Sequence, residues 1–196
     1  LTTLALAGCN QAAPTAPEKP AVPAAKAGEA PINTIDRSHA GEPGPVAVEW
    51  EMKGGTKQKL SDHKGMKMLV NLWATWCAPC IAELPNIKKV YAELHAQGFE
   101  IIGVTLENAH LSANDSPGQT VEKLAKAKKI LVDFTAKEQL PWPQHFDGKY
   151  WKNAFSTQFG ISSIPSMLLL DQAGRVVSTQ ARGEALEREV KRLLNR

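Results

Sequence analysis

The chain has 196 residues, of which 43% are hydrophobic, and a formal net charge of +3. This length and apolar content are sufficient for one ordinary domain with a buried core and for additional segments outside it. The net charge is small and the lysine-rich stretches lack interleaved aromatic residues, so nucleic acid is not an expected partner. No run reaches the roughly 18 apolar residues that a membrane-spanning helix needs.

The first nine residues end an apolar segment of the kind found in signal peptides. Residues 1–9 are Leu-Thr-Thr-Leu-Ala-Leu-Ala-Gly-Cys, and the small residues before Cys9 suit a signal-peptidase cleft. The segment resembles a bacterial lipobox, in which the cysteine is lipidated. This resemblance implies a lipid anchor at Cys9 that holds the protein to a membrane on the periplasmic side of the cell envelope. A stray cysteine in an ordinary cleaved signal peptide is the alternative.

Composition then divides the remaining chain into a tether and a folded part. Residues 10–45 consist mainly of Ala, Pro, Glu, Lys and Gly. Such a segment cannot bury enough apolar surface to fold, so we expect a disordered tether. Residues 46–196 form the expected domain. It opens with an alternating strand over 46–52 and a second strand over 56–60, which Gly54 and Gly55 would connect as a β-hairpin.

The centre of the domain is a cysteine pair placed between a strand and a helix. An apolar run at about 67–73 predicts a buried strand, and apolar residues at helical spacing predict a helix from 78 to about 97. Cys77 and Cys80 would therefore lie at the start of that helix, where unpaired N–H groups and the helix dipole stabilise a thiolate. A thiolate at Cys77 is the nucleophile of disulfide exchange, and Cys80 is placed to resolve a mixed disulfide. Pro79 suits an early helical position.

The rest of the chain alternates strands and helices. We expect strands at 99–106, 130–134, 144–147, 166–170 and 175–180, and helices at 120–129, 150–159 and 184–194. The apolar run at 99–106 is typical of a parallel sheet that is covered on both faces. The expected fold class is therefore α/β.

Two motifs connect these elements to a known family. Trp76-Cys77-Ala78-Pro79-Cys80 after a hydrophobic strand, followed by Glu83-Leu84-Pro85, resembles the thioredoxin superfamily and its membrane-tethered TlpA/ResA-type thiol-disulfide oxidoreductases. The segment 160–171, which contains Ile164-Pro165, matches the family's cis-proline segment. The resemblance implies a thioredoxin fold, a central mixed sheet flanked by helices, with an N-terminal β-hairpin and a central insertion.

The resemblance also assigns roles to individual residues. Cys77, Cys80, Glu83 and Pro165 are the expected catalytic residues, and Trp76, Pro79 and Ile164 the expected substrate-binding residues. Glu83 lies three residues after Cys80 on the same helical face. If it is buried beneath the dithiol, its pKa would be raised and it could accept the Cys80 proton. Thioredoxins proper carry an aspartate at the position that Asn71 occupies in this chain. The Asn71 amide does not titrate, so it cannot replace that aspartate. An exposed helical glutamate is the alternative for Glu83.

The expected function is that of an extracytoplasmic thiol-disulfide oxidoreductase. The resemblance implies that it reduces disulfides in envelope proteins, such as the haem-binding cysteines of apocytochrome c, and that a membrane electron donor reduces it again. No cofactor and no metal are expected. The alternatives are a disulfide oxidant or isomerase, and a metal chaperone, for copper among others, that uses the same cysteine pair as ligands. The five histidines show no pairwise metal spacing.

Overall fold

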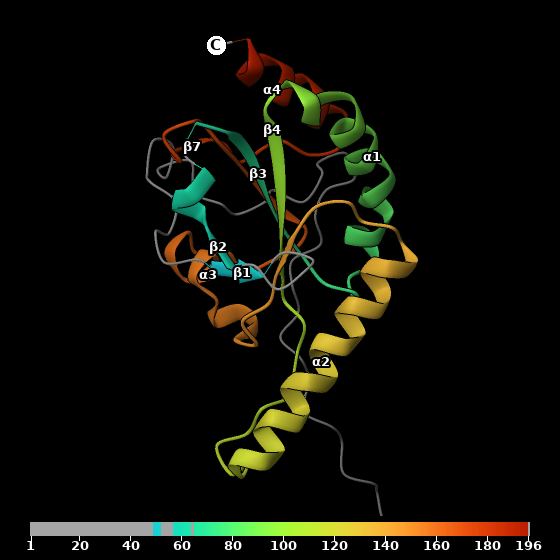
Figure 1. Cartoon of the computed structure of the whole chain (residues 1–196), viewed down its shortest axis with the longest axis vertical. Helices are drawn as coiled ribbons and strands as arrows, with labels where there is room; N and C mark the ends of the chain where they lie inside the picture. Colours follow the sequence, from blue (N-terminus) through green and yellow to red (C-terminus); the bar gives the residue numbers. More distant parts are fainter. Residues whose placement is uncertain (1–48, 52–56, 64, 196) are drawn as a thin grey trace, which may run out of the picture. The chain divides into compact units, whose positions relative to one another are not determined.

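A computed structural model describes residues 49–51, 57–63 and 65–195 (Figure 1). The expected lipidation site Cys9, residues 1–9 and the expected tether at 10–45 lie outside the described residues. The elements follow one another as β1 (Glu49–Glu51), β2 (Lys57–Lys59), η2 (Leu60–His63), β3 (Lys67–Trp73), α1 (Ala78–Leu94), η3 (His95–Gln97), β4 (Phe99–Thr105), α2 (Pro117–Lys137), β5 (Gln144–His145), η4 (Tyr150–Lys152), α3 (Ala154–Gln158), β6 (Ser166–Leu170), β7 (Val176–Ser178) and α4 (Glu184–Leu194).

The main sheet has five strands in the order β5-β4-β3-β6-β7, and β1 and β2 form a separate antiparallel pair. β3 pairs in parallel with β4, and β4 in parallel with β5, whereas β6 and β7 are antiparallel to their neighbours. All seven residues of β3 are buried. The expected α/β thioredoxin fold, with its mixed sheet, its N-terminal hairpin and its insertion between β4 and β6, is confirmed.

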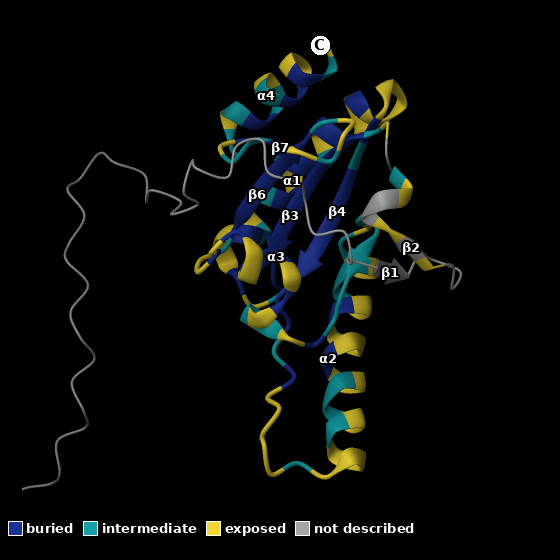
Figure 2. Ribbon diagram, turned by 90° about the vertical axis from the view of Figure 1, so that its left-hand side faces the viewer, coloured by how far each residue is buried: buried dark blue, intermediate teal, exposed yellow. Residues whose placement is uncertain are grey.

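Two apolar clusters cover the two faces of this sheet. Side chains alternate between the faces along a strand, so Met68 and Val70 join one cluster and Leu69 joins the other. The first cluster includes the cysteine pair and side chains from α2 and α3, and the second includes the buried faces of α1 and α4. Figure 2 shows the buried strands β3, β4 and β6 with helices that expose their outer sides.

One helix replaces two of the expected elements. The sequence predicts a helix at 120–129 and a strand at 130–134, but α2 runs unbroken through both. Ser116 caps its first turn in a capping box with Gln119. The buried residues of α2 are Ala127 and Leu131, four positions apart, which is the spacing of one helical face. The strand prediction was wrong because short apolar runs occur in both kinds of element.

A second expected helix is divided. Residues 150–159 contain the short η4 and then α3, and Asn153 lies between them. The Asn153 side chain accepts a hydrogen bond from the Ser156 N–H (2.9 Å) and donates one to the Tyr150 carbonyl (2.7 Å). An asparagine in this position starts a new helix rather than continuing the preceding one.

The pair Tyr91 and Glu100 connects α1 to β4 and predicts a loss of stability in alkali. Burial is the main cause that raises the pKa of Tyr91 above its ordinary value of 10.0, and the Glu100 carboxylate that accepts its hydrogen bond (3.1 Å) adds to the shift. The unfolded chain releases this proton above pH 10 while the folded protein retains it. The free energy of unfolding should therefore fall above pH 10, by at most about 1.4 kcal/mol per pH unit for one proton.

Urea unfolding at pH 9, 10 and 11 measures this effect, with Tyr91→Phe as the matched variant. The variant retains every lysine but lacks the Tyr91 hydroxyl. Its stability should therefore fall less steeply above pH 10 than that of the native protein. Equal slopes for the two proteins would contradict the assignment to Tyr91.

Candidate functional site

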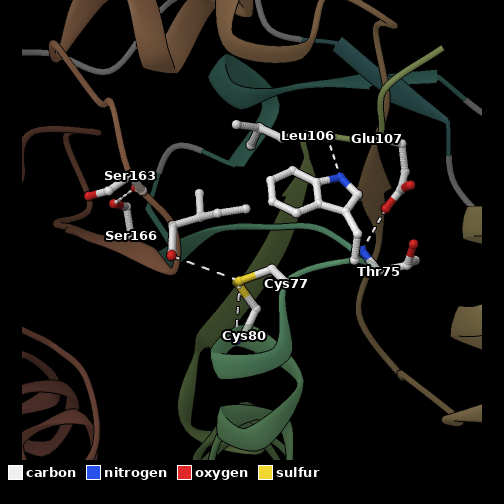
Figure 3. The surroundings of a disulfide bond; sticks show 9 residues. Thr75, Cys77, Cys80, Leu106, Glu107, Ser163 and Ser166 are labelled. Atoms are coloured by element: carbon white, nitrogen blue, oxygen red, sulfur yellow. Dashed lines mark hydrogen bonds between the residues drawn. A yellow bond between two sulfur atoms is a disulfide. The ribbon is translucent and has the colours of Figure 1, made fainter. Parts of the chain in front are cut away.

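The site is built around a disulfide at the start of α1. Cys77 and Cys80 are bonded (S–S 2.06 Å) and both are buried (Figure 3). Cys77 is the N-cap of α1, and its Sγ accepts a hydrogen bond from the Cys80 N–H at 3.3 Å. The Cys77 carbonyl accepts bonds from the N–H groups of Cys80 and Ile81. The predicted strand–turn–helix position of the pair is confirmed.

This position has a direct chemical consequence for the reduced state. The first turn of α1 directs the Cys80 N–H and the positive end of the helix dipole at the Cys77 sulfur, and both favour a negative charge there. Thiolate, not thiol, is the reactive species in disulfide exchange. Pro79 is exposed in the first turn of α1, where its missing N–H costs no hydrogen bond.

The segment before β6 faces the cysteine pair. The Ile164–Pro165 peptide bond is cis. The Cys77 Sγ lies 3.8 Å from the Ile164 carbonyl oxygen, and Pro165 is buried. Ser166, the first residue of β6, is fully buried and donates its hydroxyl to the Ser163 carbonyl at 2.6 Å. The structure thus brings together Cys77, Ile164 and Pro165, which the sequence analysis placed in one site.

An exposed aromatic surface lies beside the disulfide. Trp76 directly precedes Cys77 and is 51% exposed, although tryptophan is highly buried on average. Its indole N–H donates to the Leu106 carbonyl at 3.2 Å, which holds the ring in place. The ring of Tyr150 lies 6.1 Å from it, and Trp151 packs against Tyr150 in turn. A substrate that approaches Cys77 would therefore meet the exposed Trp76 ring beside the half-buried rings of Tyr150 and Trp151.

Glu83 is half-buried on α1, one turn beyond Cys80. Its Oε1 accepts hydrogen bonds from the Gly183 N–H (2.8 Å) and from the Asn86 side chain (2.8 Å). Gly183 precedes α4, so this carboxylate connects α1 to the start of α4. Asn71 is buried on β3, six residues before Cys77, and gives the site a neutral amide on that strand.

The sequence analysis missed another acidic residue. Glu107 follows β4 and is only 4% exposed, and its Oε1 accepts a hydrogen bond from the Thr75 N–H at 2.6 Å (Figure 3). The available signal was its place directly after the apolar run of β4. The carboxyl ends of neighbouring parallel strands meet at one edge of a sheet, and β3 ends there just before Cys77.

Across the described part of the chain, no group of three or more His, Cys, Asp or Glu side chains gathers as a set of metal ligands. Within the same residues, no helix combines the length and the apolar content needed to cross a bilayer.

The fold and the site together define a thioredoxin-fold protein with a Cys-x-x-Cys disulfide. The chain belongs to the Redoxin family, whose model matches residues 39–195. It is 29% identical over 133 residues to the thioredoxin-like protein YneN of Bacillus subtilis (67% of this chain, 66% of YneN). It is 45% identical over 74 residues to the thiol-disulfide oxidoreductase ResA of Oceanobacillus iheyensis (35% and 38%) and 23% identical over 163 residues to that of Bacillus thuringiensis (82% and 80%).

These relatives and the solved structures support the expected TlpA/ResA-type membership. The match covers slightly less than two thirds of the length of YneN and 38% of the length of the Oceanobacillus ResA. A Chlorobium tepidum protein designated as a thiol:disulfide interchange protein DsbE has a similar structure (TM-score 0.60, 25% identity, 79% of this chain and 97% of that one). A thiol:disulfide interchange protein from a Bacteroides species shares the fold (TM-score 0.62, 23% identity, 80% and 91%).

Proposed function

We propose that this protein is a thiol-disulfide oxidoreductase that reduces disulfides in proteins of the bacterial cell envelope. The observation that carries the proposal is the Cys77–Cys80 disulfide at the N-terminus of α1, beside the cis Pro165. The names of the ResA and DsbE relatives agree with this reaction class. The lipobox-like residues 1–9 support a periplasmic, lipid-anchored location, and cytochrome c maturation is the substrate pathway that the family resemblance suggests.

The reaction begins with the reduced dithiol. The Cys77 thiolate attacks one sulfur of a substrate disulfide, whose other sulfur leaves as a thiolate and takes up a proton. The Cys80 thiol then loses its proton and attacks the Cys77 sulfur, which releases the second substrate thiolate. The substrate has gained two electrons, and the protein has returned to the disulfide form. A dithiol electron donor in the membrane would reduce this disulfide for the next cycle.

Four neighbours of Cys77 have expected roles in the first step. The Ile164 carbonyl lies 3.8 Å from its sulfur, so a substrate chain that reaches this sulfur would pass alongside the Ile164 backbone. Pro165 supplies no N–H to compete with that chain. The exposed ring of Trp76 offers apolar contact area, and Pro79 forms the exposed rim of the first helical turn.

The test of this function is a reduction assay on a protein disulfide. The reduced protein, mixed with insulin at pH 7, should cleave the interchain disulfides and be recovered in the oxidised form, with one disulfide formed per disulfide reduced. Mass spectrometry after thiol alkylation counts both. If the reduced protein reacts with neither insulin nor oxidised glutathione, the proposal is overturned.

We assign Glu83 the role of proton acceptor for Cys80 in the second step, so Glu83→Gln should slow the resolution of the mixed disulfide. The expected decrease is about 100-fold, at the lower end of general base catalysis. Stopped-flow measurement of substrate thiol release after rapid mixed-disulfide formation isolates this step. Glu93→Gln is the matched control, because Glu93 is an exposed residue of the same helix. Equal resolution rates in the two variants would remove Glu83 from the mechanism.

A further inference from the structure

Glu107 combines deep burial with a direct bond to the loop that carries the nucleophile. It is 4% exposed, and its carboxylate accepts the Thr75 N–H at 2.6 Å. Thr75 lies two residues before Cys77, so this bond fixes an acidic group on the loop that leads to the reactive sulfur. The reaction described above does not use Glu107.

Anchoring of the loop alone does not explain a carboxylate at this position. The loop is already fastened to the end of β4 by two other bonds, from the Leu106 N–H to the Trp73 carbonyl (2.8 Å) and from the Trp76 indole to the Leu106 carbonyl (3.2 Å). A neutral amide oxygen could accept the Thr75 N–H equally well. Burial of a charge costs much more than burial of an amide, so the charge itself requires a reason.

We propose that Glu107 is a positioning residue whose fixed negative charge keeps the Cys77–Cys80 couple reducing, an inference that rests on the proposed function. A nearby negative charge disfavours a second one, so Glu107 opposes the stabilisation that the N-terminus of α1 gives to the Cys77 thiolate. A couple whose reduced form is stabilised is a strong oxidant. By the same relation, destabilisation of the Cys77 thiolate lowers the reduction potential.

The test is the equilibrium with glutathione at pH 7, in which the protein disulfide and two reduced glutathione molecules give the protein dithiol and oxidised glutathione. Glu107→Gln retains an oxygen acceptor for Thr75 but removes the charge. We expect the equilibrium to shift toward the reduced protein by about three- to tenfold, where tenfold corresponds to about 30 mV for this two-electron couple. Alkylation of Cys77 by iodoacetamide at pH 7 should become faster.

Glu100→Gln is the matched control. Glu100 is likewise largely buried, with only 13% of its side chain exposed, but it lies at the start of β4 whereas Glu107 follows the end of that strand. The six residues from Glu100 to Thr105 span about 17 Å, or five steps along the strand. This variant should retain the native equilibrium constant, and Glu107→Asp, which preserves the charge, should remain close to it.

Two results would overturn the inference. One is a native equilibrium constant in Glu107→Gln, and the other is an equal shift in Glu107→Asp or Glu100→Gln, which would indicate an effect of geometry or of net charge. Failure of the native protein to exchange with glutathione would instead refute the proposed function. If Glu107→Gln does not fold, NMR of the native protein provides the test, because the Glu107 carboxyl carbon resonance must move on reduction of the disulfide. An unmoved resonance overturns the proposal.

Discussion

The variant Cys80→Ser, once reduced, should accumulate as a mixed disulfide with its substrate, whereas Cys77→Ser should not react at all. Cys77 lies at the N-cap of α1 and keeps its nucleophilic position when Cys80 is replaced. Without a thiol at position 80, the mixed disulfide has no internal resolving group. We expect substrate release from Cys80→Ser to be at least about 1000-fold slower than in the native protein, since only external thiols can resolve it.

Non-reducing electrophoresis and mass spectrometry of the trapped complex measure this outcome, with each single variant as the control for the other. The experiment shows which of the two cysteines attacks the substrate first. The assignment of Cys77 as nucleophile would be contradicted if Cys80 in the Cys77→Ser variant forms a mixed disulfide as fast as Cys77 does in the Cys80→Ser variant.

The variant Trp73→Ala should lose about 3–5 kcal/mol of unfolding free energy, the usual cost of truncating a fully buried aromatic residue. Trp73 ends β3 and is completely buried. Its indole donates to Gln144 of β5 at 3.0 Å, and its ring lies 5.6 Å from that of Phe134 of α2. Trp73 therefore connects the cysteine loop to two elements of the insertion, and its removal leaves a cavity between them.

Two further variants separate the contributions to this loss. Trp73→Phe preserves most of the packing but leaves the Gln144 oxygen without its donor, and should cost about 1–2 kcal/mol. Trp76→Ala removes a half-exposed tryptophan from the same loop and should cost less than Trp73→Ala. Urea unfolding monitored by circular dichroism gives all three values. If Trp73→Ala and Trp76→Ala are equally stable, Trp73 does not have the structural role described here.

Much of the fold could be predicted because its strongest patterns are local. The continuous apolar runs of β3 and β4 and the helical spacing in α1 and α4 place those elements within a few residues of their observed bounds. The prediction of a strand at 130–134 was wrong because a short apolar run does not distinguish a strand from a helix, and only the folded structure shows that α2 continues through it. The division at Asn153 likewise depends on contacts that the side chain makes once the chain has folded.

For the site, too, local motifs could be predicted from the sequence whereas tertiary contacts could not. The spacing of Cys77 and Cys80 indicates a redox pair without any structure, and the family resemblance identifies Ile164 and Pro165 as their partners from a distant segment. The identity of the groups that touch Glu83 could not be predicted, because Gly183 lies 100 residues further along the chain. Glu107 was overlooked because its place after an apolar strand indicates the edge of the sheet, whereas only the folded structure shows that its side chain is buried.

The reduction potential of the Cys77–Cys80 couple tests the central claim most directly. Thiol trapping of the native protein across a series of redox buffers gives the potential without any assumption about the natural substrate. We predict a value at or below about −250 mV, in the range of thioredoxin. A value near about −120 mV, that of a strong oxidant, would contradict the reductive function, and a dithiol that forms no disulfide in any buffer would contradict the redox function itself.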